Sequence, residues 1–334
     1  MAIEVVRFSP DKTKEWDDFV KNHSRNGGLF TEQKFLSYHP EERFDDCSLM
    51  CYKDGKLNGV FPAASKAGEH GEKCIISHPG SSCGALVYAE TAKTRDVLAM
   101  LEAVISYYKS EEAASLELRL AEPIFDMPSA EELTYLLWHR GFELKSKELA
   151  SCVRLDEKKK WRSYGRKKNK TDINNLLRKG FTVAQTQEVS DIYPLIERNL
   201  EKRYNKKPTH SFEELKYLKE MYPERIHFWA VSYEGKVVGT VVAFAVNDKA
   251  VHDFYIAQDY EFANYNLMPM LFYHIFESYL EQGYEWYNFG ISSRGDLIKW
   301  GILEFKERMG GRATARESYI LKDIQSYENY EFPD

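Results

Sequence analysis

The order of expected strands and helices occurs twice along this chain, and this repetition constrains the fold more than any single motif. In both halves, apolar residues either alternate with polar ones, which is typical of strands, or recur at helical spacing. The order in each half is a strand, helices, an antiparallel meander, a helix, a strand, a helix and a strand. Two such halves predict an internally duplicated α/β (α+β) fold, with mixed, mostly antiparallel sheets flanked by helices.

Turn signals and periodicity place the elements of each half. Asp54-Gly55 is a strong signal for a two-residue hairpin turn. The first half is expected to hold strands at 3–8, 115–121, 142–146 and 150–155, a hairpin over 48–65, a loop at 77–85 between strands, and helices at 14–22, 91–110 and from Pro128 to Gly141. The second half is expected to hold strands at 181–186, 285–290 and 316–321, three strands over 226–257, and helices at 189–204, 212–221, 265–282 and 297–309.

A basic segment separates the two halves. Residues 158–179 contain ten Lys or Arg and one acid, Asp172, although the whole chain is acidic. The segment predicts a helix over 163–179 and places a boundary near 155–160, giving domains 1–155 and 156–334. Its charges could bind a phosphorylated substrate or an RNA backbone, and the interleaved Trp161 and Tyr164 could stack on bases. A solvated helix face beside a linker explains the charges equally well.

Composition excludes several classes of protein. A net charge of −6 argues against a protein that coats DNA, and no apolar run is long enough for a membrane span. The first residues lack the basic and apolar regions of a signal peptide. Five cysteines without a C-x-x-C pair indicate reduced thiols. The nine histidines have no metal-ligand spacing, so no metal is expected. The chain is therefore expected to be cytoplasmic, and nothing in it indicates an oligomeric state.

The loop at 77–85 is the densest group of small and polar residues. Its glycines allow close backbone approach to a ligand, which makes His78 and Ser81 candidate substrate-binding residues. A nucleophilic Cys83–His78 pair is a sharper possibility, but it requires a geometry that the sequence does not contain. A tight turn with an inert thiol is the alternative.

Further candidates lie in the second half. Ser211 and Glu214 form a capping box at the start of a helix, whereas Arg203 and His210 have no structural explanation in the sequence. We therefore expect Arg203 and His210 to bind substrate. Ser292 follows the strand expected at 285–290, and ligands of α/β proteins bind at the ends of sheet strands. Ser292 is thus another candidate substrate-binding residue.

Taken together, these segments resemble the Fem-type branch of the GNAT acyltransferase superfamily. The matching segments include ISHPGSSCGALV, NLEKRYNKKPTHSFEEL, VHDFYIA, YNFGIS and EFKERMGGR, and they follow one another in the same order through nearly the whole chain. The resemblance implies two tandem GNAT-like domains, with the donor site in the second. It also implies transfer of an acyl or aminoacyl group to an amine, with the donor held between two strands that splay apart, here 251–257 and 285–289.

The resemblance also implies which residues meet the donor. The segment QDYEFANYN after the first wedge strand lacks the glycines of the loop that binds coenzyme A in GNAT enzymes. Fem-type enzymes share this departure, and their bridge-forming members use aminoacyl-tRNA. The expected donor is therefore either an acyl-CoA or an aminoacyl-tRNA. A tRNA is therefore a candidate partner. The Phe-Lys pair of the branch matches Phe305 and Lys306, and Lys306 is expected to be catalytic.

No cysteine or serine is convincingly activated, so we expect direct attack of the acceptor amine in a ternary complex. Period-two alternation places Asp253 and Tyr255 on one face of the wedge strand as catalytic candidates, with His252 on the other. The expected acceptor is a cell-envelope precursor, such as an amino sugar nucleotide in polysaccharide biosynthesis or a muropeptide. The alternative is a catalytically silent module that binds a precursor or a tRNA.

Overall fold

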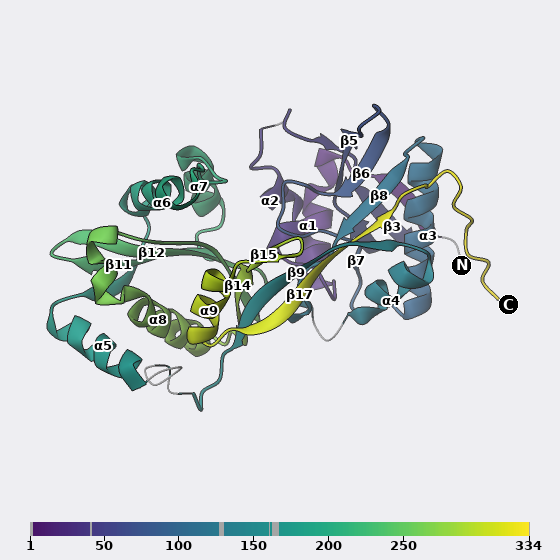
Figure 1. Cartoon of the computed structure of the whole chain (residues 1–334). Helices are drawn as coiled ribbons and strands as arrows, with labels where there is room; N and C mark the ends of the chain where they lie inside the picture. The colour runs from purple at the N-terminus through teal and green to yellow at the C-terminus, as the bar shows by residue number, and fades with distance from the viewer. Residues whose placement is uncertain (1–2, 41, 127–129, 160, 162–166, 334) are drawn as a thin grey trace. The chain divides into compact units, whose positions relative to one another are not determined.

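The computed structural model describes all residues except 1–2, 41, 127–129, 160, 162–166 and 334. The chain forms two compact units, one made of 1–148 with 315–334 and the other of 149–314 (Figure 1). The sequence placed everything after 155 in the second domain. The difference arises because the last strand pairs with a strand of the first unit, a long-range contact that local pattern does not encode.

The first unit contains two groups of strands covered by helices. Strands β1, β3, β4 and β7 pair in that order, and all of these pairs are antiparallel. Strands β17, β8, β6, β5 and β2 form the second group, in which only β6 and β8 are parallel. The bounds are β1 (Ile3–Arg7), β2 (Asp45–Asp46), β3 (Leu49–Lys53), β4 (Lys56–Phe61), β5 (Ala63–Ala67), β6 (Lys73–Ser77), β7 (Val87–Tyr88), β8 (Ser115–Arg119), β17 (Arg312–Leu321), α1 (Thr13–Asn22), α2 (Gln33–Leu36), α3 (Thr94–Ser110) and α4 (Glu131–His139).

The core of the first unit forms around α3. Val97, Leu101 and Val104 lie on its buried face, as their spacing predicts, and they join a cluster with Trp16 of α1 and Ile324 near the end of the chain. The C-terminal segment therefore completes this core.

The second unit is a mixed sheet with helices on both faces. Its strand order is β10, β11, β12, β13, β14 and β9, and only β13 and β14 are parallel. Helices α6 and α7 lie on one side of the sheet, whereas α5 and α8 lie on the other (Figure 1). The bounds are β9 (Glu143–Arg154), β10 (Thr182–Thr186), β11 (Ile226–Tyr233), β12 (Lys236–Ala245), β13 (Ala250–Gln258), β14 (Trp286–Ile291), α5 (Lys167–Arg178), α6 (Val189–Tyr204), α7 (Phe212–Met221), α8 (Leu267–Glu281) and α9 (Trp300–Arg308), with a 3₁₀ turn η5 (Tyr260–Tyr265) before α8.

The predicted class of mixed, mostly antiparallel sheets flanked by helices is confirmed, but two elements differ. The strands expected at 142–146 and 150–155 are one continuous strand, β9. The helix expected at 297–309 begins only at Trp300, because β15 (Ser293–Arg294) and β16 (Leu297–Ile298) form a small hairpin before it. Pro128, Tyr164 and the expected helix start at 163 lie outside the described residues. Within the residues that are described, no helix has the length and apolarity to cross a membrane.

Candidate active site

A pocket of about 830 Å³ lies where β13 and β14 separate. The two strands pair at only three positions, the last being His252 with Asn288. The next residue of each strand, Asp253 and Phe289, lines the pocket. Helix α6, the rest of β13, η5 and α9 supply other parts of the wall. The expected splay of the two wedge strands is thus present, and it opens into a cavity of the size that holds small-molecule ligands.

The expectation that Asp253 and Tyr255 share one face of β13 is wrong. Tyr255 pairs with Val242 and Asp253 with Ala243, so the residue between them, Phe254, is a β-bulge. Because adjacent residues of β12 point to opposite faces, the two candidates also point to opposite faces. Asp253 lines the pocket, whereas Tyr255 is not among its lining residues.

Tyr255 and His210 lie together, away from the pocket lining. The Tyr255 hydroxyl accepts the backbone N–H of His210 at 3.0 Å and lies 3.1 Å from its Nδ1 atom. Burial raises the pKa of Tyr255 to about 12. Both side chains are buried, and the Tyr193 hydroxyl donates to the His210 carbonyl oxygen. These bonds fix the segment between α6 and α7.

Lys306 is buried at the wall of the pocket. Its side chain is only 4% exposed, and its Nζ atom donates to the carbonyl oxygens of Gly290 at 2.8 Å and Ile291 at 2.7 Å. Both carbonyls lie in β14 beyond its last pair with β13. Gly290 has a φ of +69°, which favours glycine and turns the strand end toward α9. The neighbouring Phe305 is half-buried and also lines the pocket, so both residues of the Phe-Lys pair line it, while their role toward a donor stays a prediction.

Asp253 is a buried carboxyl beside this lysine. It is 6% exposed, and neither carboxylate oxygen has a hydrogen bond of standard geometry to a described residue. Burial raises the pKa of Asp253 well above its usual range, while the charge of Lys306 and the nearby Tyr287 hydroxyl oppose the rise. The environment therefore favours the protonated, neutral carboxyl.

The other candidates of the second unit differ in position. Arg203 of α6 is exposed and lines the pocket, as expected for a substrate-binding residue. Ser292 is buried and is not among the lining residues; its backbone N–H donates to the Leu149 carbonyl oxygen and its own carbonyl accepts the Lys299 N–H. Its Oγ atom has no hydrogen bond within the described part of the chain. Ser292 thus positions the segment that carries Lys299.

Sequence reasoning missed Lys299, Trp300 and Arg308, which line the same pocket. All three are exposed and stand in or beside α9, where charged and aromatic residues carry no periodic signal of function.

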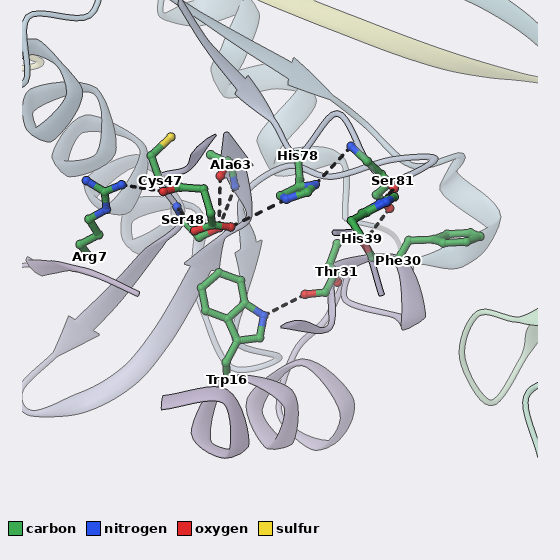
Figure 2. A network of polar contacts seen from close by, with 12 residues as sticks. Arg7, Trp16, Phe30, Thr31, His39, Cys47, Ser48, Ala63, His78 and Ser81 are labelled. Carbon is green, nitrogen blue, oxygen red and sulfur yellow. Dashed lines mark hydrogen bonds and ion pairs between the residues drawn. The ribbon is translucent and has the colours of Figure 1, made fainter. Parts of the chain in front are cut away.

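In the first unit, the loop at 77–85 is held by its own polar side chains (Figure 2). His78 Nδ1 accepts the Gly80 N–H at 3.2 Å, and its Nε2 lies 3.8 Å from an Asp46 carboxylate oxygen. Burial lowers the pKa of His78 to about 4, so the ring is neutral near pH 7. The Ser81 hydroxyl donates to the Phe30 carbonyl oxygen at 2.7 Å.

Cys83 belongs to the same loop and is buried, and its burial raises the pKa of its thiol. A thiol in such surroundings is a poor nucleophile. The contacts of His78 and Ser81 match the tight-turn interpretation of the loop, while their substrate-binding role stays a prediction.

The basic segment is only partly available for binding. Trp161 is buried and packs on Phe276 with ring centroids 4.9 Å apart, so its ring does not offer a stacking surface. In α5, Ile173 and Leu176 face the core, as their spacing predicts, whereas Leu177, which was also expected to face inward, is 38% exposed. Lys168 is exposed. No group of three or more His, Cys, Asp or Glu side chains that could hold a metal ion occurs among the residues placed by the structure.

Residues 164–307 match the family model of the acetyltransferase (GNAT) domain. We refer to this matched segment as the GNAT domain. It contains the splayed strands, Asp253, Lys306 and all of the pocket lining named above except Arg308. The prediction of an acyltransferase is therefore confirmed at the level of the domain family. No curated protein matches the chain by sequence.

Solved structures share the fold of the whole chain. The crystal structure of FemX has a TM-score of 0.73 at 14% identity, over 96% of this chain and 98% of that one. The C-terminal domain of a putative lysylphosphatidylglycerol synthetase from Agrobacterium fabrum has a TM-score of 0.58 at 12% identity, over 93% and 91%. A tandem GNAT protein of clavulanic acid biosynthesis has a TM-score of 0.55 at 10% identity, over 96% and 98%. The fold of tandem GNAT-like domains and its resemblance to the Fem-type branch are thus confirmed.

Proposed function

We propose that this chain is an N-acyltransferase that transfers an acyl or aminoacyl group to the amine of a cell-envelope precursor. The observation that carries the proposal is the pocket of the GNAT domain, where the wedge strands separate beside the buried ammonium of Lys306. Backbone polar groups beyond His252 and Asn288 no longer bond across the two strands. They and Lys306 are suited to hold an acyl carbonyl and the negative charge that develops on its oxygen.

The reaction that fits this site is a direct transfer. The acceptor amine attacks the donor carbonyl carbon, a C–N bond forms, and the bond to the leaving oxygen or sulfur breaks as the amine loses a proton. Cys83, with its raised pKa, lies in the first unit, and residues 164–307 contain no cysteine. Cys152 of β9 is buried and is not among the residues that line the pocket. This supports a ternary complex without an acyl-enzyme.

The turn after β13 bears on the choice of donor. Asp259 caps η5 with one carboxylate oxygen on the Glu261 N–H and pairs with Lys236 at 2.8 Å through the other. Pro269 in the first turn of α8 has no N–H to offer. An acid and a missing donor oppose a diphosphate at this turn. We therefore place an aminoacyl-tRNA ahead of an acyl-CoA as donor.

The acceptor is proposed from the folds that the chain shares. FemX and a putative lysylphosphatidylglycerol synthetase are among the proteins of like fold, and both suggest envelope chemistry. An amino sugar nucleotide or a muropeptide would bring the amine, and the phosphates of the nucleotide would suit the exposed Lys168 of the basic segment.

A transfer assay on the full chain tests the proposal. Labelled aminoacyl-tRNA and labelled acyl-CoA are each combined with an amino sugar nucleotide or a muropeptide, and the products are identified by mass. An amide-linked product with one donor supports the proposal. Thermal stabilisation by a donor or acceptor without product in any combination would instead indicate a silent binding module.

A further inference from the structure

Several residues that line the pocket are also open to solvent, and we call this exposed part of its lining the mouth. Trp300, the first residue of α9, lines the pocket and yet is 62% exposed. Arg203, Lys299 and Arg308 line the same pocket and are also exposed. Among the described residues that line the pocket, the acidic one is the buried Asp253, whose raised pKa favours its neutral form. The mouth therefore combines a flat apolar surface with a strongly positive rim.

The described part of the chain supplies no ion-pair partner for these cations. Arg203, Lys299 and Arg308 form no ion pair with the residues that the structure describes, whereas Lys236 at the nearby turn is paired with Asp259. Folding gains nothing from leaving a large indole ring exposed beside these cations, because burial of the ring would stabilise the folded state. A ligand that is both flat and polyanionic would use all four.

We infer that Trp300 and the cations Arg203, Lys299 and Arg308 form a nucleotide-binding subsite at the mouth of the pocket. A base stacks on the Trp300 ring, and the phosphates attached to it lie against the three cations. This inference rests on the proposed function, since the nucleotide would be the carrier end of the donor whose acyl group enters the pocket toward Lys306. In this arrangement the phosphates bind to cations in or beside α6 and α9, and not to the turn at Asp259.

Two donors could present this chemistry, an acyl-CoA through its adenosine phosphates and a charged tRNA through its terminal nucleotides. Both carry a base and phosphates at the end remote from the acyl group, so the subsite alone does not separate them. Direct measurements of the binding of CoA and of RNA distinguish the two donors.

The experiment measures binding to the full chain by calorimetry with three probes: CoA, phosphopantetheine, and a short single-stranded RNA ending in adenosine. Variants Trp300→Ala and Trp300→Phe are compared with the matched control Trp138→Ala. Trp138 is 68% exposed on α4 in the first unit. Loss of one stacked base should weaken the nucleotide probes about 5- to 150-fold in Trp300→Ala, with recovery in Trp300→Phe and no change in Trp138→Ala. The preferred nucleotide probe identifies the source.

The contribution of the three cations is tested separately, through the salt dependence of RNA binding. Arg308→Met should weaken the RNA at low salt and make its affinity less dependent on salt concentration, as expected for one lost phosphate contact. Equal affinity of Trp300→Ala and Trp138→Ala for both nucleotide probes would overturn the inference, as would phosphopantetheine binding as tightly as CoA with no RNA binding. Because these measurements need no transfer, a failed transfer assay would refute the proposed function and leave the subsite standing.

Discussion

Replacement of Lys306 by methionine is expected to affect both the stability and the activity of the GNAT domain. The unbranched apolar side chain of methionine fills most of the space of the lysine stem, so the core around α9 stays packed. What is lost is the pair of hydrogen bonds at 2.8 and 2.7 Å from the ammonium to the Gly290 and Ile291 carbonyl oxygens. Lys306→Met therefore isolates the loss of the charge and its two bonds.

The size of the stability change follows from these two bonds. A hydrogen bond from a charged donor contributes about 1.5 to 3 kcal/mol, and Lys306→Met leaves two carbonyls without it. Taking the lower value for each gives a loss of about 3 kcal/mol. For a unit of this size, 1 kcal/mol shifts Tm by about 2 to 4 °C, so calorimetry should record a fall on the order of 6 to 12 °C.

The activity change separates two roles for the lysine. If its ammonium meets the developing oxyanion, kcat should fall on the order of 100-fold or more. If it only holds the donor, the loss should appear mainly in KM. Kinetics are measured at a temperature at which both proteins are fully folded. Glu307→Gln, an exposed neighbour on α9 that does not line the pocket, is the control. Equal Tm and equal kcat in the two variants would refute the reasoning.

Three other changes have defined outcomes. Asp253→Asn should be at least as stable as the natural protein at pH 8, and its stability should fall less as pH rises above 3.8, because burial makes the folded state hold a proton that the unfolded chain releases. Thermal melts at several pH values measure this, and a large destabilisation would mean that an ionised Asp253 pairs with Lys306. His78→Gln should flatten the loss of stability as pH falls from 6.5 to about 4, since the folded ring stays neutral where the unfolded one gains a proton, with exposed His70→Gln as control. Cys83→Ser should leave turnover nearly unchanged, and a trapped thioester on Cys83 would contradict direct transfer.

Local signals in the sequence predict the elements that local chemistry controls. Helix α7 begins and ends as expected because the Ser211–Glu214 capping box fixes its start, and both hydrogen bonds of the box are present. The β-bulge at Phe254 has no comparable signature, because it arises from the pairing of β13 with β12. One extra residue in a strand was enough to separate Asp253 from Tyr255.

The candidate site likewise contains some residues that the sequence predicts and others that only the three-dimensional fold identifies. Phe305 and Lys306 were expected from a family pattern, and the structure places both in the pocket lining. Trp300 and Lys299 were missed because their significance lies in their exposure beside a cavity, which depends on the three-dimensional fold. His210 was expected to bind substrate because no structural reason for it was visible in the sequence, but its hydrogen bonds with Tyr255 supply such a reason, and its binding role stays a prediction.

The discontinuous first unit sets the order in which the chain can fold during synthesis. Residues 149–314 are contiguous, so the second unit can fold once they leave the ribosome. The first unit must wait for 315–334, which pairs Ser318 with Arg119 of β8 and brings Ile324 into its core. At ordinary elongation rates that wait is on the order of 10 to 30 s. Loss of the last twenty residues would therefore damage the amino-terminal unit, while the unit nearer to the break would still be complete.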